Sequence, residues 1–244
     1  MPAEPLTALL LGATGLVGRS LLREVLALPE YASVRVLARR ALQPRPRLEV
    51  RVVDFDRPES WDDALAAQHV FCTLGTTMKK AGSEAAFRKI DLELPLEVAR
   101  RARKHGATAL FVVTALGADP ASKLFYYRTK GELERALKEL GYPTLCLFRP
   151  SFLTGEREES RPGERLGIAA AKTVAPFLRG GLRRFRPIPA EDVAKAMASV
   201  AHTVIASRDP LGFAIYESDA LSELSAAIAT SAPRADFHTT RPAD

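Results

Sequence analysis

A glycine-rich turn near the start of the chain limits its fold more than any other feature. The segment Gly12-Ala13-Thr14-Gly15-Leu16-Val17-Gly18 follows an apolar run, Leu6–Leu11, and precedes a stretch with apolar residues on one helical face. A glycine pattern alone is weak evidence, but a strand before it and a helix after it are the context of a dinucleotide-binding turn. Glycines permit the tight turn and let a pyrophosphate approach the amides at the positive end of the helix. We therefore expect a pyrophosphate to lie against Gly12, Thr14, Gly15, Leu16, Val17 and Gly18; a tight turn without a ligand is the alternative.

Strand-like and helix-like stretches alternate along most of the chain. Strands are expected at Leu6–Leu11, Ser33–Ala38, Leu48–Val53, His69–Leu74, Ala109–Val113, Thr144–Phe148 and near Phe213–Tyr216. Helices are expected after Gly18 and at Pro58–Ala67, Ser83–His105, Ser122–Leu140, Leu166–Leu178 and Ala190–Ser199. Strands buried on both faces that alternate with helices form parallel sheets with right-handed crossovers. The predicted fold class is α/β, a doubly wound parallel sheet of the Rossmann type.

The length of 244 residues suits one domain with a small addition. We expect a single NAD(P)-binding domain over residues 1–230, with a C-terminal substrate cap formed by residues 156–189. The cap is expected because the polar segment EREESRPGE and the basic segment RGGLRRFRPIP interrupt the regular pattern there. Residues 231–244 are expected to form a flexible tail.

The charge and residue composition of the chain bear on which partners it could bind. The chain has 35 Lys and Arg against 29 Asp and Glu, a net charge of +6. This excess is modest, and no base-reading motif accompanies it, so no nucleic-acid partner is expected and Arg179–Arg186 is expected to form a solvated or substrate-facing rim. The four histidines lack metal-ligand spacing, so no metal site is expected. No apolar stretch reaches the length of about 18 residues that a membrane span needs, so no span is expected.

The cysteines bear on the cellular compartment. Cys72 and Cys146 each lie in an apolar run, which fits two reduced core thiols and no disulfide framework. The first residues also lack the basic region and small-residue cleavage site of a signal peptide. These observations favour a cytoplasmic location.

The second predicted strand bears on the choice of dinucleotide. An NAD-binding chain would place Asp or Glu about 20 residues past the glycine turn to bind the ribose hydroxyls. This chain has Arg39 and Arg40 there, and a guanidinium binds a 2′-phosphate that a carboxylate would repel. NADP(H) is therefore favoured, and NAD(H) remains possible. Asp54 is expected near the adenine or in a simple turn, and Leu74, Gly75, Thr76 and Thr77 are expected to line the cofactor channel.

Two residues on a predicted helix have the spacing of an acid–base pair. Tyr126 and Lys130 lie four residues apart and therefore share one helical face. A neighbouring ammonium favours the phenolate, which lets the phenol exchange a proton with a carbonyl or alcohol oxygen. Thr114 closes the fifth predicted strand and is expected to orient the same oxygen.

Four motifs, GATGLVG, CTLGTT, TALGADPASKLFYYRTKGELE and LFRPSFLTGERE, resemble the atypical short-chain dehydrogenase/reductases. The resemblance is to their branch of small NAD(P)-binding proteins similar to the Tat-interacting oxidoreductase. It implies that Tyr126 and Lys130 form the catalytic pair and that the backbone of Arg149, Pro150 and Ser151 faces the nicotinamide. The family has Ser where this chain has Thr114, and it places a polar residue behind the pair, in the region of Asp91.

The motifs and the resemblance predict an NADP(H)-dependent oxidoreductase that moves a hydride between the nicotinamide and a carbonyl or alcohol of a small molecule. An NADPH-binding sensor or regulatory protein with little or no turnover is the alternative. A sugar-nucleotide epimerase is a third reading, although it usually needs a larger C-terminal lobe. The substrate, the direction of reaction and the choice between monomer and homodimer stay open.

Overall fold

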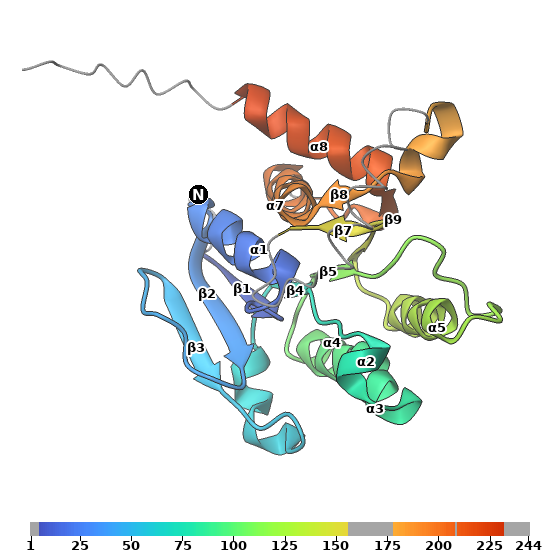
Figure 1. Ribbon diagram of the computed structural model, residues 1–244. Helices are drawn as coiled ribbons and strands as arrows, with labels where there is room; N and C mark the ends of the chain where they lie inside the picture. The colour runs from blue at the N-terminus through green and yellow to red at the C-terminus, as the bar shows by residue number, and fades with distance from the viewer. Residues whose placement is uncertain (1–4, 156–177, 208, 232–244) are drawn as a thin grey trace, which may run out of the picture.

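The computed structural model describes residues 5–155, 178–207 and 209–231, and its centre is a seven-stranded parallel sheet. The strands are β1 (Leu6–Leu11), β2 (Tyr31–Ala38), β3 (Leu48–Val52), β4 (His69–Cys72), β5 (Ala109–Val113), β6 (Thr144–Arg149) and β9 (Gly212–Glu217). Their order across the sheet is β3-β2-β1-β4-β5-β6-β9, so the chain reverses its direction of winding between β1 and β4 (Figure 1). This arrangement confirms the predicted doubly wound α/β fold of the Rossmann type.

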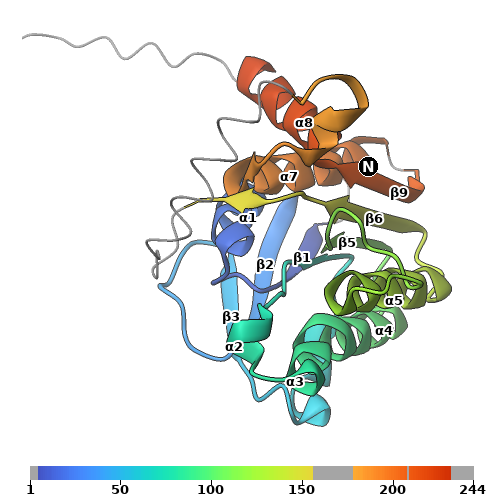
Figure 2. The same ribbon diagram turned by 45° about the vertical axis from the view of Figure 1, so that its right-hand side comes forward.

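Helices cover both faces of the sheet (Figure 2). One face carries α1 (Leu16–Ala27), α7 (Ala190–Ser207) and α8 (Ser218–Ser231), and the other carries α4 (Leu94–Lys104) and α5 (Phe125–Glu139). The short helices α2 (Met78–Ala81) and α3 (Glu84–Arg88) follow β4. A small second sheet pairs β7 (Leu153–Thr154) with β8 (Ile188–Pro189).

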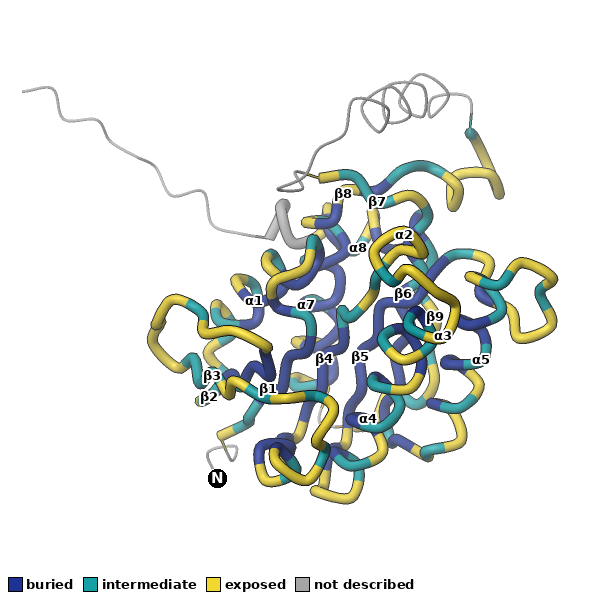
Figure 3. Tube along the Cα trace, turned by 60° about the horizontal axis from the view of Figure 1, so that its bottom comes forward, coloured by how far each residue is buried: buried dark blue, intermediate teal, exposed yellow. Residues whose placement is uncertain are grey.

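Alternate residues of each strand enter separate hydrophobic cores. In β1, Ala8 and Leu10 pack toward α1 and α7, whereas Leu9 and Leu11 pack toward α4 and α5. Figure 3 shows the central strands buried along their length. Burying one leucine side chain contributes about 1.5–3 kcal/mol, so the two cores hold the strand ends firmly in register. The carboxyl ends of the parallel strands are thereby fixed in position, and the loops that follow the strands begin from these fixed points.

Several predicted elements differ in extent from the observed ones. The predicted helix Pro58–Ala67 is a pair of 3-10 turns, Pro58–Ser60 and Asp62–Leu65. Trp61 joins them because its ring is buried and its indole N–H donates to the Asp54 carbonyl, which fixes this segment without a regular helix. The predicted helix Ser83–His105 contains a wider π-helical turn at Lys89–Glu93.

The C-terminal part is more regular than the sequence indicates. Helix α7 continues to Ser207 instead of ending at Ser199, and α8 was not expected at all. Because α8 includes Ser231, it takes the first residue of the predicted tail. The predicted helix Leu166–Leu178 lies outside the described residues except for its last residue, and residues 156–177 of the cap and 232–244 of the tail also lie outside them.

A buried histidine makes stability depend on pH. His69 is 5% exposed, its Nδ1 lies 2.7 Å from the Tyr31 hydroxyl, and burial lowers its pKa from 6.5 to about 4. Between these values the unfolded chain binds the proton and the folded chain does not, so acid favours unfolding. A shift of this size corresponds to about 3 kcal/mol. We expect this group to lower the free energy of unfolding by about that amount as pH falls from 7 toward 4, measured by urea denaturation.

His69→Gln is the matched variant, because its side-chain oxygen accepts a hydrogen bond from Tyr31 but takes up no proton in this pH range. It should be less stable at pH 7 and lose most of the slope between pH 6.5 and pH 4. An unchanged slope in this variant would show that other groups carry the acid sensitivity.

Candidate cofactor and active site

The glycine-rich turn is held by close packing against the end of β4. Gly12 has φ +83°, and a Cβ there would lie 2.8 Å from the Thr73 backbone. A Cβ on Gly18 would lie 2.0 Å from the Gly12 carbonyl oxygen, closer than any real contact. The first and third glycines are therefore required by the fold itself, since they allow helix α1 to begin directly against β1.

The N-terminus of α1 has the features of an anion site. Gly15 is its N-cap residue and provides no side chain to cap it, and its first turn carries no acidic residue. The amides of Leu16, Val17 and Gly18 thus begin the helix at the positive end of its dipole. These observations fit a dinucleotide pyrophosphate against Thr14, Gly15 and the first turn of α1.

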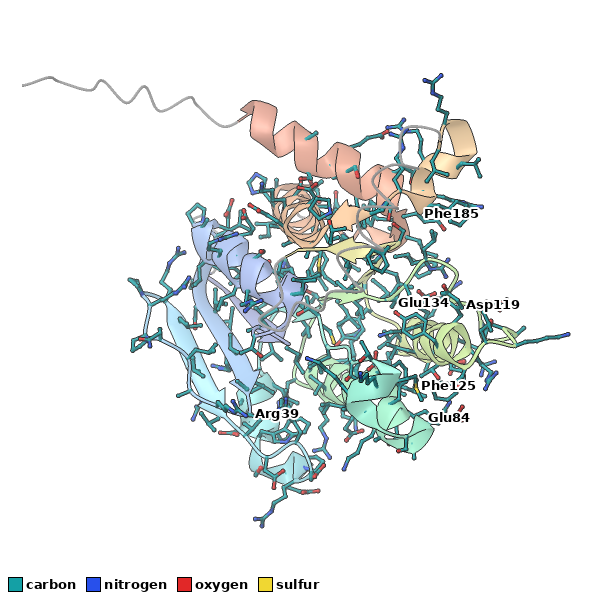
Figure 4. The ribbon with its side chains drawn as sticks, viewed as in Figure 1. Arg39, Glu84, Asp119, Phe125, Glu134 and Phe185 are labelled. Atoms are coloured by element: carbon teal, nitrogen blue, oxygen red, sulfur yellow. The ribbon has the colours of Figure 1, made fainter. Side chains whose placement is uncertain are left out.

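Arg39 and Arg40 directly follow β2, which is hydrogen-bonded to β1 in the sheet. Both are exposed, and Figure 4 shows Arg39 where the β2 arrow ends. Asp54 follows β3 at the same edge and is exposed, with its Oδ1 accepting the Asp56 amide hydrogen in a local turn. The sheet therefore brings the predicted phosphate, ribose and adenine contacts to one edge, since parallel strands end together.

The loop after β4 has one end tied to the protein interior. Leu74 is half-buried, Gly75 is exposed, and the Thr76 amide donates to Asp91 Oδ2 at 2.8 Å. The Thr77 hydroxyl caps α2 by accepting from the Lys80 amide. A Cβ on Gly75 would lie 3.5 Å from Asp91 Oδ1, so this glycine packs directly against the buried carboxylate.

Tyr126 and Lys130 lie in the first half of α5, as predicted, but differ in their environments. Lys130 is 3% exposed and its Nζ lies 2.7 Å from Asp91 Oδ1. Tyr126 is 38% exposed, and the Phe87 ring packs edge-on against it with centroids 5.8 Å apart. One residue of the pair is thus a buried cation with a counter-ion, and the other is a partly exposed tyrosine whose ring packs against Phe87.

The charges around these two residues act in opposite directions. Burial and the Asp91 carboxylate raise the pKa of Tyr126, while the Lys130 ammonium lowers it, and the net result is a raised pKa. Burial lowers the pKa of Lys130, but Asp91 more than offsets this effect. Tyr126 is therefore a phenol and Lys130 an ammonium at neutral pH.

Thr114 is buried at the end of β5, and its hydroxyl donates to Glu134 Oε1 at 2.6 Å. Glu134 is also buried and receives two guanidinium hydrogen bonds from Arg149, one of them at 2.9 Å. In this arrangement Thr114 Oγ1 can accept a hydrogen bond from an alcohol, but its hydrogen is not available to a carbonyl oxygen. The expected role of Thr114 in orienting a carbonyl would thus need that hydrogen to leave Glu134.

Polar backbone atoms of the segment after β6 form hydrogen bonds with other parts of the protein. The Pro150 carbonyl accepts the Leu116 amide hydrogen at 2.9 Å, and the Ser151 amide donates to the Ser218 hydroxyl at 2.7 Å. The Arg149 side chain is engaged with Glu134. These contacts fix the end of β6 beside β9 and α8.

Three supporting residues were absent from the sequence prediction. Glu134 follows Lys130 at the same four-residue helical spacing, which was the signal for it. Gly131 lets the loop at Asp119 and Pro120 lie against α5, since a Cβ would meet that backbone at 2.2 Å. Phe87 supports the Tyr126 ring from α3, and nothing local in the sequence indicates that contact.

Within the described ranges, no group of three His, Cys, Asp or Glu residues is placed to hold a metal ion. No helix in the same part of the chain is long and apolar enough to cross a membrane.

Comparisons with known proteins identify relatives. A family model described as NAD(P)H-binding matches residues 12–204. Protein FMP52, mitochondrial, from Coccidioides immitis is 32% identical over 224 residues, which cover 84% of this chain and 89% of that protein. Protein HTATIP2 from Rattus norvegicus is 36% identical over 162 residues, which cover 64% of this chain and 66% of that protein. The family resemblance seen in the motifs is thereby confirmed.

Among solved structures, a UDP-glucuronic acid 4-epimerase from Bacillus cereus in complex with NAD is similar to this chain, with a TM-score of 0.60. The match covers 86% of this chain and 76% of the epimerase at 13% sequence identity. Identity at this level shows a shared fold and nothing about the reaction.

The expected cytoplasmic location was wrong. FMP52 relatives from several fungi are named mitochondrial, which points away from the cytoplasm. Cys72 and Cys146 are indeed free and buried, but reduced thiols report only a reducing environment and do not identify the compartment.

The glycine turn and the strand order agree with the family match over most of the chain. The chain belongs to the NAD(P)H-binding family, with HTATIP2 and FMP52 among its relatives.

Proposed function

We propose that this protein is an NADP(H)-dependent oxidoreductase acting on a carbonyl or alcohol of a small molecule. The observation that carries the proposal is the placement of Tyr126. Its phenol is partly exposed on α5, four residues before the buried Lys130 ammonium. Asp91 joins that ammonium to the Thr76 amide in the loop after β4. The lysine that shares a helical face with Tyr126 is thereby connected to the loop after β4, the strand next to β1 in the sheet.

The dinucleotide would be held by residues from three strand ends. Gly12, Gly15, Gly18 and the first turn of α1 would take the pyrophosphate, Arg39 and Arg40 the 2′-phosphate, and Asp54 the adenine side. When bound, the nicotinamide supplies or accepts the hydride. Gly75 and Thr76 would line the channel next to Lys130.

Side chains of the protein supply the proton that the substrate oxygen takes up. In reduction, Tyr126 donates its phenolic proton to the substrate oxygen as negative charge develops there. The Lys130 ammonium stabilises the phenolate that remains and would bind the nicotinamide ribose. Thr114 accepts a hydrogen bond from the alcohol product, or orients the carbonyl once its own hydrogen leaves Glu134.

An NADPH-binding sensor is the second candidate. The engagement of the Thr114 hydroxyl with Glu134 favours it, because it leaves the site one donor short for a carbonyl oxygen. Wild-type protein should consume NADPH with at least one member of a broad aldehyde and ketone panel if it is an enzyme. Tight NADPH binding without consumption across the panel would favour the sensor.

The choice of NADP(H) over NAD(H) is tested by the paired variant Arg39→Ala/Arg40→Ala. Each charge-assisted hydrogen bond contributes about 1.5–3 kcal/mol, so NADPH affinity should fall roughly 10- to 100-fold or more. NADH affinity should change little, since NADH lacks the 2′-phosphate. Calorimetric titration with both dinucleotides measures the two affinities.

Arg135→Ala is the matched control, because Arg135 is another exposed arginine but lies on α5 away from β2. It should leave both affinities unchanged. Equal loss of NADPH and NADH in the Arg39/Arg40 variant, or no preference in wild type, would contradict the assignment of these arginines.

A further inference from the structure

The basic rim predicted from the sequence contains arginines in two different situations. Arg183 and Arg184 are exposed and pair with acids: Arg183 Nη2 lies 3.3 Å from Glu223 Oε1, and Arg184 Nη1 lies 3.4 Å from Glu217 Oε2. Arg186 is half-buried, and within the described residues its guanidinium has no hydrogen-bond or ion-pair partner. Its Nε atom is buried without an acceptor. One charge of the rim is therefore not neutralised by any contact within the fold.

The other half-buried arginines of the described residues all donate side-chain hydrogen bonds to carboxylates or backbone carbonyls. They are Arg35, Arg88, Arg101, Arg103, Arg128 and Arg149. A buried donor without an acceptor is costly, and a charged donor costs more than a neutral one. In a native fold such a donor indicates an acceptor that the chain itself does not supply.

The backbone of Arg186 is fixed at both of its polar groups. Its amide donates to the Arg183 carbonyl at 3.0 Å, and its carbonyl accepts the Ser151 hydroxyl hydrogen. Two residues further along, the Ile188 amide donates to the Phe152 carbonyl at 3.0 Å, where β8 joins β7. Arg186 is thus held against the segment that directly follows β6.

That segment also contacts other parts of the candidate site. The Pro150 carbonyl accepts the Leu116 amide hydrogen at 2.9 Å, in the loop between β5 and α5. At the other end, a Cβ on Gly155 would lie 3.0 Å from Leu16 Cδ1, in the first turn of α1. Arg186 therefore lies at the carboxyl edge of the sheet, where open α/β sheets bind their ligands.

Two exposed aromatic residues adjoin these hydrogen-bonded positions. Phe185 directly precedes Arg186 and is 47% exposed (Figure 4), and Phe152 directly follows Ser151 and is 49% exposed. Large exposed apolar side chains beside a few polar groups are typical of ligand-binding surfaces. The combination fits a ligand with an apolar body and one negative group.

We propose that Arg186 is an anion subsite of the candidate active site, so that the substrate is a carbonyl or alcohol compound that carries a carboxylate or a phosphate on an apolar body. A guanidinium binds either group through paired N–H···O bonds. That the ligand is a substrate rests on the proposed function. The phosphates of the dinucleotide do not require Arg186, because the α1 amides and Arg39 with Arg40 are assigned to them.

The test measures anion binding to protein saturated with NADPH, so that the phosphates of the dinucleotide already occupy their own sites. The probes are benzoate and phenyl phosphate, with benzamide as the neutral counterpart, and NMR titration of each probe gives its Kd. Wild-type protein should bind one of the anions about 10-fold or more tightly than benzamide, and the tighter anion identifies the preferred group. Equal affinity for both anions and benzamide would overturn the proposal.

Arg186→Met removes the charge and keeps an apolar stem. Affinity for the preferred anion should fall about 10-fold or more, while affinities for benzamide and NADPH stay unchanged. Arg184→Met is the matched control, because that guanidinium already pairs with Glu217. It should change anion affinity by about 2-fold or less.

Unchanged anion affinity in Arg186→Met would overturn the proposal. So would a loss of NADPH affinity as large as the loss of anion affinity, because Arg186 would then serve the dinucleotide. If Arg186→Met does not fold, Arg186→Gln keeps a polar side chain without the charge, and the same loss of anion affinity is expected from it. Unchanged anion affinity in that variant would contradict the proposal equally.

Failure of the proposed function is distinguishable from failure of the anion subsite. A protein that binds the anion through Arg186 and consumes no NADPH with any carbonyl has the subsite and lacks the activity. For turnover, each compound of the carbonyl panel is tested with its anionic group and as the neutral methyl ester. Among the active compounds, kcat/KM for the anion should exceed that for the ester about 10-fold or more, and Arg186→Met should abolish this preference. A preference that persists in Arg186→Met, or no preference in wild type, would overturn the proposal.

Discussion

Replacing Tyr126 with Phe should lower kcat/KM for carbonyl reduction about 100- to 10,000-fold, the range expected when a positioned general acid is removed. Affinity for NADPH should stay nearly unchanged, because the phenol hydroxyl serves the substrate oxygen. Stability should also change little, since the ring remains packed against Phe87. The measurements are NADPH consumption with the best substrate of the carbonyl panel, calorimetric titration of NADPH and thermal unfolding.

Tyr127→Phe provides the matched control, because it removes the same hydroxyl from the next residue of α5 and keeps the ring, which packs edge-on against that of Tyr126. Its turnover should remain close to that of wild type. Equal losses in the two variants, or full activity in Tyr126→Phe, would rule out Tyr126 as the acid.

Gly18→Ala should have the largest effect on cofactor binding. The added Cβ would lie 2.0 Å from the Gly12 carbonyl oxygen and 2.8 Å from Thr73 Oγ1, so α1 must move away from the turn. We expect a loss of about 3 kcal/mol in the free energy of unfolding, at the upper end of the cost of overpacking. NADPH affinity should fall roughly 100-fold, because the helix amides leave the pyrophosphate.

The control is Gly181→Ala, the same change at a glycine with no atom within 4 Å of the added Cβ. It should change stability by about 0.5 kcal/mol or less and leave NADPH binding intact. Urea denaturation and calorimetric titration below the unfolding transition measure both quantities. If Gly18→Ala bound NADPH like wild type, the glycine turn would not be the pyrophosphate site.

Sequence patterns predicted the structure best where it depends on interactions between neighbouring residues. The β1–turn–α1 unit was predicted closely, because unbroken apolar runs, glycine conformational freedom and helical periodicity each depend on neighbouring residues. The segment Pro58–Ala67 was mispredicted because a tertiary anchor, the buried Trp61, outweighs weak helical periodicity. Helix α8 was missed because its last turns border a polar segment that reads as a tail.

The contacts within the candidate site likewise include some that the sequence predicts and some that it does not. The four-residue spacing of Tyr126 and Lys130 followed from the sequence alone, since helix geometry sets which side chains share a face. The commitment of the Thr114 hydrogen to Glu134, 20 residues away, did not. Spacing along one element cannot reveal contacts between β5, α5 and β6.

By itself, the sequence determined the class of fold, the dinucleotide turn and the identity of the residues on the candidate catalytic face. Only the tertiary structure decided the protonation states of these residues. Lys130 and Asp91 are 39 positions apart, and the π turn and the packing of α4 and α5 on one sheet face bring their charges to 2.7 Å. Charges interact through space and burial determines how strongly, so the protonation of Tyr126 is a property of the folded chain.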